Sequence, residues 1–546
     1  MTTTIYSARR IITMNPSRPE ATHVAVRDGR ILGVGPLEDL AAWGPHERDE
    51  RFADKVLMPG FVEGHSHLMT GGLWRYVYCG YFPVQRPDGS RAQGSPTLEA
   101  VVDGLTVAAR ATAGDAAAPP VLGWGFDPIY FGQRRCSRAD LDRVSTERPV
   151  GILHASGHIL NVNSVALQRA GLLRAGVDHP GIPLGPDGLP TGELKGPDAM
   201  GAAFAHVGLN RSFLSSDAFG MRAFGQLAVR AGVTTATDLA ATLGEDEVTN
   251  MLAVTAEADY PVRIVPLLRL IGMTPAEAVE RAAALRARST EQLRLGRIKV
   301  VADGSIQGYS ARLRWPGYIN GAPNGLWYTP PPTVRQAYAL ALQRGVQIHT
   351  HTNGDEATEM VLDQLEDVLR EQPASDHRFI LQHCQLADAA QFRRIKALGM
   401  GVNLFANHHF YWGEQHRAVT VGPERAERMN ACATALRTGV PFAVHSDAPV
   451  TPLGPLFTAW CAVNRLTSTG RVLGAQERIS VPDALHAVTL GAAWTLKLDG
   501  EVGSIECGKR ADFCVLEDDP LTVAPEALKD VRVWGTVQGG RIFRAS

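Results

Sequence analysis

Short apolar runs separated by stretches of helical character recur through the middle of the 546-residue chain. This alternation is typical of a parallel β/α architecture, in which each buried strand is followed by a helix that covers it. The number of runs predicts a (β/α)8 TIM-like barrel, which carries its chemistry at the carboxyl ends of the strands. The expected strands are residues 56–58, 233–237, 262–268, 298–302, 346–351, 379–383, 401–405 and 442–445.

Residue types that bind metals well stand at the ends of several of these runs. His65 and His67 follow the first run one residue apart, so the alternation of side chains in an extended segment places both on one face. Taken singly, each such side chain is better explained as a hydrogen-bonded core residue than as a metal ligand. Their recurrence at the strand ends of one barrel predicts a shared metal site. The other members are Lys299, His351, His383 and Asp447.

The two ends of the chain both read as short strands. Residues 4–35 alternate apolar and polar side chains around a hairpin signal at Asp28-Gly29. Residues 512–516, 531–537 and 541–543 repeat this pattern near the C-terminus. We therefore expect a small β-sandwich domain built from residues 1–55 and 500–546, with the barrel occupying residues 56–499.

A long excursion separates the first two barrel runs. Residues 70–225 are rich in Gly, Pro and Ala and include a further strand-like run at 150–154. Connections of this length usually carry function or hold a subdomain of their own. We expect an inserted subdomain over the barrel mouth.

Composition narrows the choice of partners and compartment. A net charge of −2 and a pI near 6.8 offer no field for nucleic acid or an anionic membrane. The seven cysteines form no Cys-x-x-Cys pair, which fits reduced thiols in the cytoplasm. No export signal or membrane-spanning run is apparent. A small-molecule substrate is expected, and the sequence leaves open whether the protein is a monomer or a homo-oligomer.

The order of these residues resembles that of the amidohydrolase superfamily of metal-dependent hydrolases. The likeness is strongest to its YtcJ-type branch, amidohydrolase family 3, which includes N-substituted formamide deformylases. The segments that carry the resemblance span nearly the whole chain. They are residues 58–67 (MPGFVEGHSH), 158–164 (HILNVNS), 232–238 (GVTTATD), 303–305 (DGS), 351–355 (HTNGD), 382–383 (QH), 446–449 (SDAP) and 503–512 (GSIECGKRAD).

The resemblance implies an open catalytic site for divalent metal, with Zn²⁺ expected first and Mn²⁺ or Fe²⁺ as alternatives. In a two-metal form, His65, His67 and Asp447 hold one ion, His351 and His383 hold the other, and an N6-carboxylated Lys299 bridges them. If Lys299 stays unmodified, one ion held mainly by His65, His67 and Asp447 is the simpler form. His351 or His383 then binds the metal or the substrate.

The expected mechanism is attack by a metal-activated hydroxide on a polarised carbonyl. Asp447 accepts the proton of the water and passes it to the departing nitrogen. His158, in the insertion, either donates a hydrogen bond to the substrate carbonyl or stabilises the insertion itself. The favoured reaction is hydrolysis of an amide, N-acyl or N-formyl C–N bond. A lactone or carbamate hydrolase, a deaminase and a metal-dependent decarboxylase are alternatives on the same scaffold.

Aromatic residues follow several strands, which favours a small, apolar or aryl-bearing substrate, although many of them could instead pack the insertion against the barrel. His349 and His445 lie two residues from candidate ligands and are expected to fill the barrel. Asp355 is expected to cap the helix after the fifth strand. The candidate substrate-binding residues are Trp74, Trp124, Asp303, Arg312, His408 and Tyr411. For Asp303 and Arg312, support of the metal ligands is favoured over contact with the substrate.

Overall fold

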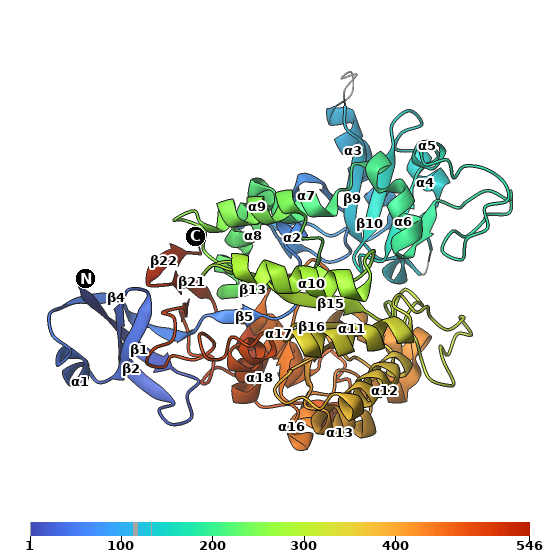
Figure 1. Ribbon diagram of the computed structural model, residues 1–546. Coiled ribbons are helices and arrows are strands. Elements are labelled where there is room, and N and C mark those ends of the chain that lie inside the picture. The colour runs from blue at the N-terminus through green and yellow to red at the C-terminus, as the bar shows by residue number, and fades with distance from the viewer. Residues whose placement is uncertain (1, 113–117, 133, 546) are drawn as a thin grey trace. The chain divides into compact units, whose positions relative to one another are not determined.

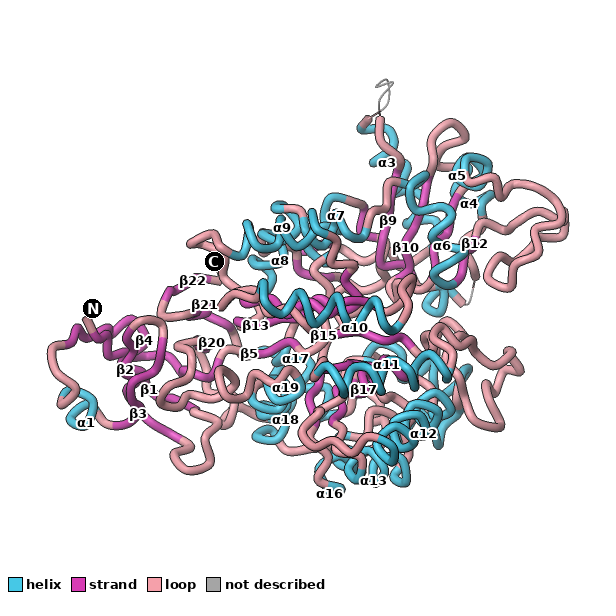
Figure 2. The backbone as a smooth tube through the Cα atoms, in the orientation of Figure 1, coloured by secondary structure: helices cyan, strands magenta, loops and turns pink. Residues whose placement is uncertain are grey.

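The computed structural model describes residues 2–112, 118–132 and 134–545. The chain forms two compact units. The first comprises Met1–His67, Phe224–Ala448 and Leu453–Ser546, and the second comprises Leu68–Ala223 with Pro449–Pro452. The second unit starts and ends two residues before the limits, 70 and 225, expected for the insertion. Figure 1 labels the elements along the chain, and Figure 2 distinguishes its helices, strands and loops.

An eight-stranded parallel sheet forms the barrel of the first unit, which confirms the predicted TIM-like fold. Each strand pairs with its neighbour in the order β5-β13-β14-β15-β16-β17-β18-β19. Past the carboxyl ends of β5 and β19, Ser66 and Ala448 form a parallel bridge that joins the first and last strands. The strands are β5 (Phe61–Glu63), β13 (Val233–Ala241), β14 (Arg263–Arg269), β15 (Arg297–Val301), β16 (Gln347–Thr352), β17 (Ile380–His383), β18 (Gly401–Leu404) and β19 (Phe442–Val444).

The predicted position of the first barrel strand, residues 56–58, was wrong, because the strand starts at Phe61. Residues 56–58 belong to β4 (His46–Pro59) of the terminal sheet, where they pair with β20 (Phe513–Leu516). Gly60 separates the two sheets, and a Cβ atom there would lie 2.0 Å from Oγ1 of Thr234, so only glycine passes this point. The barrel strand starts at Phe61, whose N–H donates to the carbonyl of Gly232.

Helices surround the barrel strands, as Figures 1 and 2 show for α10, α11 and α12. Successive helices pack side by side, α10 on α11, α11 on α12 and α12 on α13. Helix α12 is amphipathic, because Val361, Leu365 and Val368 on one face are buried. The helices are α9 (Glu245–Thr255), α10 (Pro275–Leu285), α11 (Pro331–Arg344), α12 (Asp355–Glu371), α13 (Ala389–Ala397), α14 (His408–Gln415), α15 (Gly422–Arg428), α16 (Cys432–Thr438), α17 (Pro455–Asn464), α18 (Val481–Ala487) and α19 (Leu490–Thr495).

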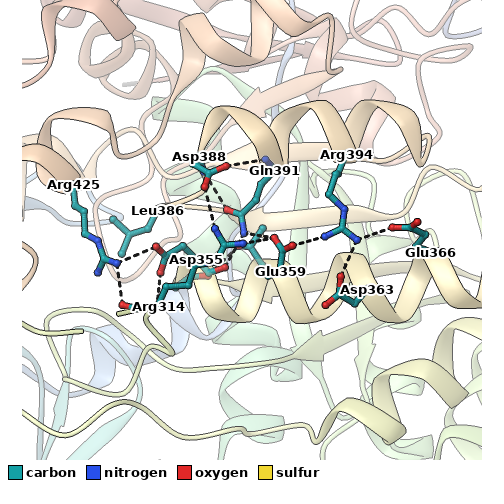
Figure 3. A network of polar contacts seen from close by, with 12 residues as sticks. Arg314, Asp355, Glu359, Asp363, Glu366, Leu386, Asp388, Gln391, Arg394 and Arg425 are labelled. Carbon is teal, nitrogen blue, oxygen red and sulfur yellow. Dashed lines mark hydrogen bonds and ion pairs between the residues drawn. The ribbon is translucent and has the colours of Figure 1, made fainter. Parts of the chain in front are cut away.

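Ion pairs hold helices α12 and α13 together (Figure 3). Arg394 of α13 bonds to Glu359, Asp363 and Glu366 of α12 at 2.5–2.8 Å. The expectation that Asp355 caps α12 was wrong. The cap is Gly354, and the Asp355 carboxylate instead accepts the N–H of Arg314 and pairs with Arg425.

Both termini contribute to one seven-stranded sheet, which confirms the predicted β-sandwich domain. Long strand β4 belongs to both parts, because its residues pair with parallel β1 and with antiparallel β20. The expected hairpin turns are present, and Asp28, Gly29, Gly539 and Gly540 all have positive φ. The remaining strands are β1 (Thr3–Ile12), β2 (Glu20–Arg27), β3 (Arg30–Gly35), β21 (Val533–Gln538) and β22 (Arg541–Arg544), and the short helix is α1 (Leu37–Ala41).

The second unit contains a five-stranded sheet in the order β12-β11-β10-β9-β6 and a two-stranded β7-β8 ribbon. The strand expected at 150–154 is β10 (Val150–His154). The other elements are β6 (Val77–Tyr78), β7 (Val84–Gln85), β8 (Arg91–Ala92), β9 (Val121–Phe126), β11 (Ile159–Val162), β12 (Glu193–Lys195), α2 (Met69–Gly72), α3 (Leu98–Ala111), α4 (Arg138–Asp142), α5 (Ser164–Arg169), α6 (Gly196–Phe204), α7 (Arg211–Ser216) and, reaching the first unit, α8 (Ala218–Arg230).

None of the helices in the described part of the chain combines the length and the apolar character that a membrane span needs.

Candidate metal centre

His65, His67 and Asp447 converge where the first and last barrel strands end. Oδ1 of Asp447 lies 3.3 Å from Nε2 of His65 and 3.2 Å from Nε2 of His67. Donor atoms bound to a tetrahedral Zn²⁺ at about 2.0–2.1 Å stand about 3.3–3.4 Å apart. The donor atoms of this triad lie within 4.8 Å of one another, so the three residues fit one divalent ion.

Two residues at this edge hold an unusual backbone conformation. Asp447 has φ of 54° and His383 has φ of 67°, in the left-handed region that non-glycine residues seldom occupy. Such conformations cost of order 1–3 kcal/mol and concentrate at functional sites. The main chain is therefore strained where it presents two of the predicted ligands.

His383 and His445 form a second buried pair beside the triad. Nδ1 of His383 lies 3.1 Å from Nε2 of His445, and the His65 ring centroid lies 4.4 Å from that of His383. These three histidines make a second group of donor atoms within 4.8 Å. His445 was expected to fill the barrel, although its place two residues before Asp447 repeats the His65-x-His67 spacing and offered a signal.

Burial sets the protonation state of these imidazoles. Desolvation lowers the pKa of His65, His383 and His445 well below its usual value, and it does the same for His349 deeper in the barrel. Neutral imidazoles are the form that binds metal. The cluster is therefore ready to accept an ion without first losing protons.

Lys299 lies on β15 with its amine buried. Its Nζ atom has no hydrogen-bond partner among the described residues. Desolvation lowers the pKa of this amine to about 7, against a smaller opposing effect of the Asp447 carboxylate. A large neutral fraction at physiological pH is the state in which a lysine amine can react with CO₂.

His351 lies near this cluster but directs Nε2 elsewhere. That atom is 3.3 Å from the carbonyl oxygen of Gly304 and 3.1 Å from Nδ2 of Asn353. The His351 ring centroid is 4.5 Å from that of His383, yet His351 belongs to neither group of converging donor atoms found among the described residues.

Glu63 is a buried carboxyl at this site that was not among the predicted site residues. Its oxygens accept hydrogen bonds from the Ser446 hydroxyl at 2.8 Å and from the N–H groups of Ser446 and His65, both at 3.2 Å. Burial raises the pKa of Glu63 to about 8. Glu63 thus ties the two segments that carry His65 and Asp447, and its position two residues before His65 was the available signal.

Asp303 and Arg312 are engaged with the loops around His351. The Asp303 carboxylate accepts the N–H groups of Asn353, Gly354 and Arg312 at 2.9–3.0 Å, and its burial raises its pKa to about 7. The Arg312 guanidinium pairs with Glu356 at 2.7 Å. Both side chains therefore hold loops in place, and their predicted contact with substrate stays a prediction.

Aromatic and imidazole rings continue from the cluster into the segment after β18. The Phe405 centroid lies 4.9 Å from that of His445 and 4.7 Å from that of His408. Nδ1 of His408 lies 3.0 Å from Nε2 of His416. Tyr411 follows on α14 and contacts Phe457. Aromatic and imidazole rings therefore pack beside the histidine cluster after β18.

The remaining predicted site residues lie in the second unit. His158 is half-buried in the connection between β10 and β11, where its N–H donates to the Ser156 hydroxyl. Trp74 and Trp124 pack edge to face with centroids 5.1 Å apart, beside the apolar core of that unit. Their roles in catalysis and substrate binding stay predictions.

One family model and several known proteins match nearly the whole chain. The amidohydrolase family model matches residues 53–544. The chain is 27% identical to the putative amidohydrolase YtcJ of Bacillus subtilis (strain 168), covering 97% of both chains, which confirms the resemblance found from sequence. It is 25% identical to the N-substituted formamide deformylase of Arthrobacter pascens, covering 95% of this chain and 94% of that protein.

A solved structure shares the fold. An uncharacterized metal-dependent hydrolase from Pyrococcus horikoshii OT3 superposes with a TM-score of 0.72 at 18% identity, covering 96% of this chain and 99% of the other.

Proposed function

Because the chain belongs to the amidohydrolase family of metal-dependent hydrolases, we propose that it hydrolyses a carbon–nitrogen bond of a small amide. The bond is of the amide, N-acyl or N-formyl type, and the substrate is apolar or bears an aryl group. The observation that carries the proposal is the convergence of His65, His67 and Asp447 at one end of the barrel.

The donor set suits a divalent ion of intermediate hardness, with Zn²⁺ first and Mn²⁺ or Fe²⁺ as alternatives. Bound there, the ion supplies a lowered pKa for water and polarisation of the substrate carbonyl. His65, His67 and Asp447 favour a single ion. A second ion requires a carbamate on Lys299, which the buried and unpartnered amine supports, together with ligands from His351 and His383.

Asp447 is the proton carrier in this proposal. Its Oδ1 atom has no hydrogen-bond donor among the described residues, although it faces both histidines of the triad. A carboxylate in this position takes the proton of the attacking water and returns it to the leaving nitrogen. His65 and His67 would hold the ion beside this carboxylate, since their Nε2 atoms lie 3.3 and 3.2 Å from its Oδ1 atom.

The apolar substrate class is supported by Phe405, which lies against the imidazoles of His445 and His408. The relative from Arthrobacter pascens, named an N-substituted formamide deformylase, makes the N-formyl group the first substrate to test.

The proposal is tested by product analysis on protein loaded with Zn²⁺ or Mn²⁺. A panel of N-formyl, N-acyl, carbamate and lactone compounds, each with aryl and short alkyl substituents, is incubated with equal amounts of enzyme. Formate or another carboxylic acid together with an amine is the expected result. Release of ammonia, or of CO₂, or turnover of lactones alone would assign the site to a different reaction.

A further inference from the structure

A continuous line of buried polar side chains leads from His65 to the carboxyl end of helix α19. Nδ1 of His65 lies 2.7 Å from Oε1 of Gln382, and Nε2 of Gln382 lies 2.8 Å from Nδ1 of His349. Nε2 of His349 then lies 3.0 Å from the carbonyl oxygen of Thr495. His65, Gln382 and His349 are each at most 2% exposed, so solvent does not interrupt the line.

The last member of this line fixes the direction of every hydrogen bond in it. A backbone carbonyl only accepts, so Nε2 of His349 carries the proton and donates to Thr495. A neutral imidazole has one N–H group, so Nδ1 of His349 is an acceptor and receives the Nε2–H of Gln382. The Gln382 amide is thereby oriented with Oε1 toward His65.

We infer that Gln382 and His349 are positioning residues that fix the tautomer of His65. Oε1 of Gln382 accepts the Nδ1–H of His65, which leaves Nε2 of His65 with its lone pair free. That Nε2 atom lies 3.3 Å from Oδ1 of Asp447, in the triad that fits an ion. The inference rests on the proposed metal-dependent function and adds the residues that hold a ligand in its binding form.

The carbonyl that anchors the line is available because of its place in the fold. Thr495 is the last residue of α19, where carbonyl groups lack a partner within the helix. It accepts from His349 and, at 2.9 Å, from Nε2 of Gln347, which lies two residues earlier on β16. Gln347 donates to the same carbonyl as His349 but has no hydrogen bond to His65 or Gln382, and it therefore provides a matched control.

The test measures Zn²⁺ affinity by competition with a chromogenic chelator on the full-length protein without substrate. Gln382→Met keeps the length of the side chain but cannot accept the Nδ1–H of His65, and we expect about 10–100-fold weaker binding. Gln347→Met removes a buried hydrogen bond to the same carbonyl, and we expect affinity within threefold of the wild type. Circular dichroism checks that both variants are folded.

Gln382→Glu distinguishes positioning from a merely structural role. A glutamate still accepts from His65 but no longer donates to His349, so Zn²⁺ affinity should recover to within about threefold of the wild type. Equal affinity of Gln382→Met and wild type, or binding by Gln382→Glu as weak as that of Gln382→Met, overturns the inference. If the wild type binds Zn²⁺ in the same experiment, the inference about Gln382 fails without contradicting the proposed metal-dependent hydrolase.

A neutron structure of the wild-type protein tests the same point without any variant. Deuterium is expected on Nε2 of His349 and on Nδ1 of His65. Deuterium on Nδ1 of His349 would show that the line runs the other way and would overturn the assignment.

Discussion

Oδ1 of Asp447 lies 3.2 Å from Nε2 of His67, and the segments that carry these residues are joined by backbone hydrogen bonds. The N–H of His67 donates to the carbonyl of Ala448 at 2.8 Å, and the N–H of Asp447 donates to the carbonyl of His65 at 3.0 Å. The candidate ion site therefore lies on the seam where the first and last barrel strands meet. An ion bound there would link the segment after the first strand to the segment after the last strand.

Metal removal is expected to abolish activity and to lower thermal stability together. A ligand that binds only the folded state at 100 times its Kd contributes about 2.7 kcal/mol. Dialysis against a strong chelator, followed by melting curves with and without added Zn²⁺ or Mn²⁺, measures both effects. Activity that survives complete removal, verified by elemental analysis, contradicts the metal-dependent mechanism.

Asp447→Asn is expected to lower kcat by roughly 10²–10⁴-fold, the usual contribution of a general acid–base group. The amide keeps the shape of the side chain but no longer accepts and returns a proton. Asp388→Asn serves as control, because Asp388 is the N-cap of α13 and bonds to Gln391 there. The control should change the melting temperature slightly and leave kcat unchanged. Near-normal kcat in Asp447→Asn would remove Asp447 from the proton-carrying role.

The barrel could be predicted because its strands are buried on both sides and so appear as apolar runs between helices. The start of the first barrel strand could not be predicted, because residues 56–58 are as apolar as a barrel strand although they belong to the terminal sheet. A buried strand carries no local mark of the sheet to which it belongs. The break at Gly60 depends on the close approach of Thr234, a tertiary contact.

At the site, residue type at the strand ends predicted the candidate ligands and the family resemblance implied their grouping into a triad, whereas neither indicated the supporting residues. Glu63 and Gln382 act through hydrogen bonds to segments distant in sequence, and neither has a local pattern that specifies its partner. Asp355 illustrates the opposite error. Its carboxylate was expected to cap its own helix, but tertiary contacts with Arg314 and Arg425 occupy it instead.

Lys299→Met is expected to stabilise the metal-free protein at neutral pH. Burial lowers the pKa of Lys299 from 10.5 to about 7, so between these values the unfolded chain binds the extra proton and stability rises with pH. Burial of this amine therefore lowers the free energy of unfolding most below pH 7, by at most roughly 5 kcal/mol. This destabilisation decreases as the pH rises toward 10.5.

Urea unfolding of metal-free wild type and Lys299→Met at pH 7 and pH 9 measures this difference, which should be smaller at pH 9. A Lys299→Met variant that is less stable than the wild type at pH 7 would show that the lysine is not held there as a free amine. Carbon-13 NMR after incubation with labelled bicarbonate then reports whether a carbamate is present.

The second unit should lose stability in acid because it buries a neutral histidine. Desolvation lowers the pKa of His154 from 6.5 to about 4, so the unfolded chain binds more protons in this window. The neutral, buried His154 therefore makes its full contribution to the free energy of unfolding above pH 6.5. Up to about 3 kcal/mol of this contribution is lost as the pH falls toward 4. His154→Gln preserves a donor for the Asn161 side chain, to which His154 is hydrogen-bonded, without a titrating ring.

Urea unfolding from pH 7.5 to 4.5, followed by tryptophan fluorescence, should therefore show a flatter pH dependence in His154→Gln than in the wild type. His46→Gln, at a half-buried histidine of β4 in the first unit, is the control for replacing a histidine by glutamine. Equal slopes in all three proteins would mean that His154 gains its proton without unfolding, which requires water or a carboxylate to reach the ring.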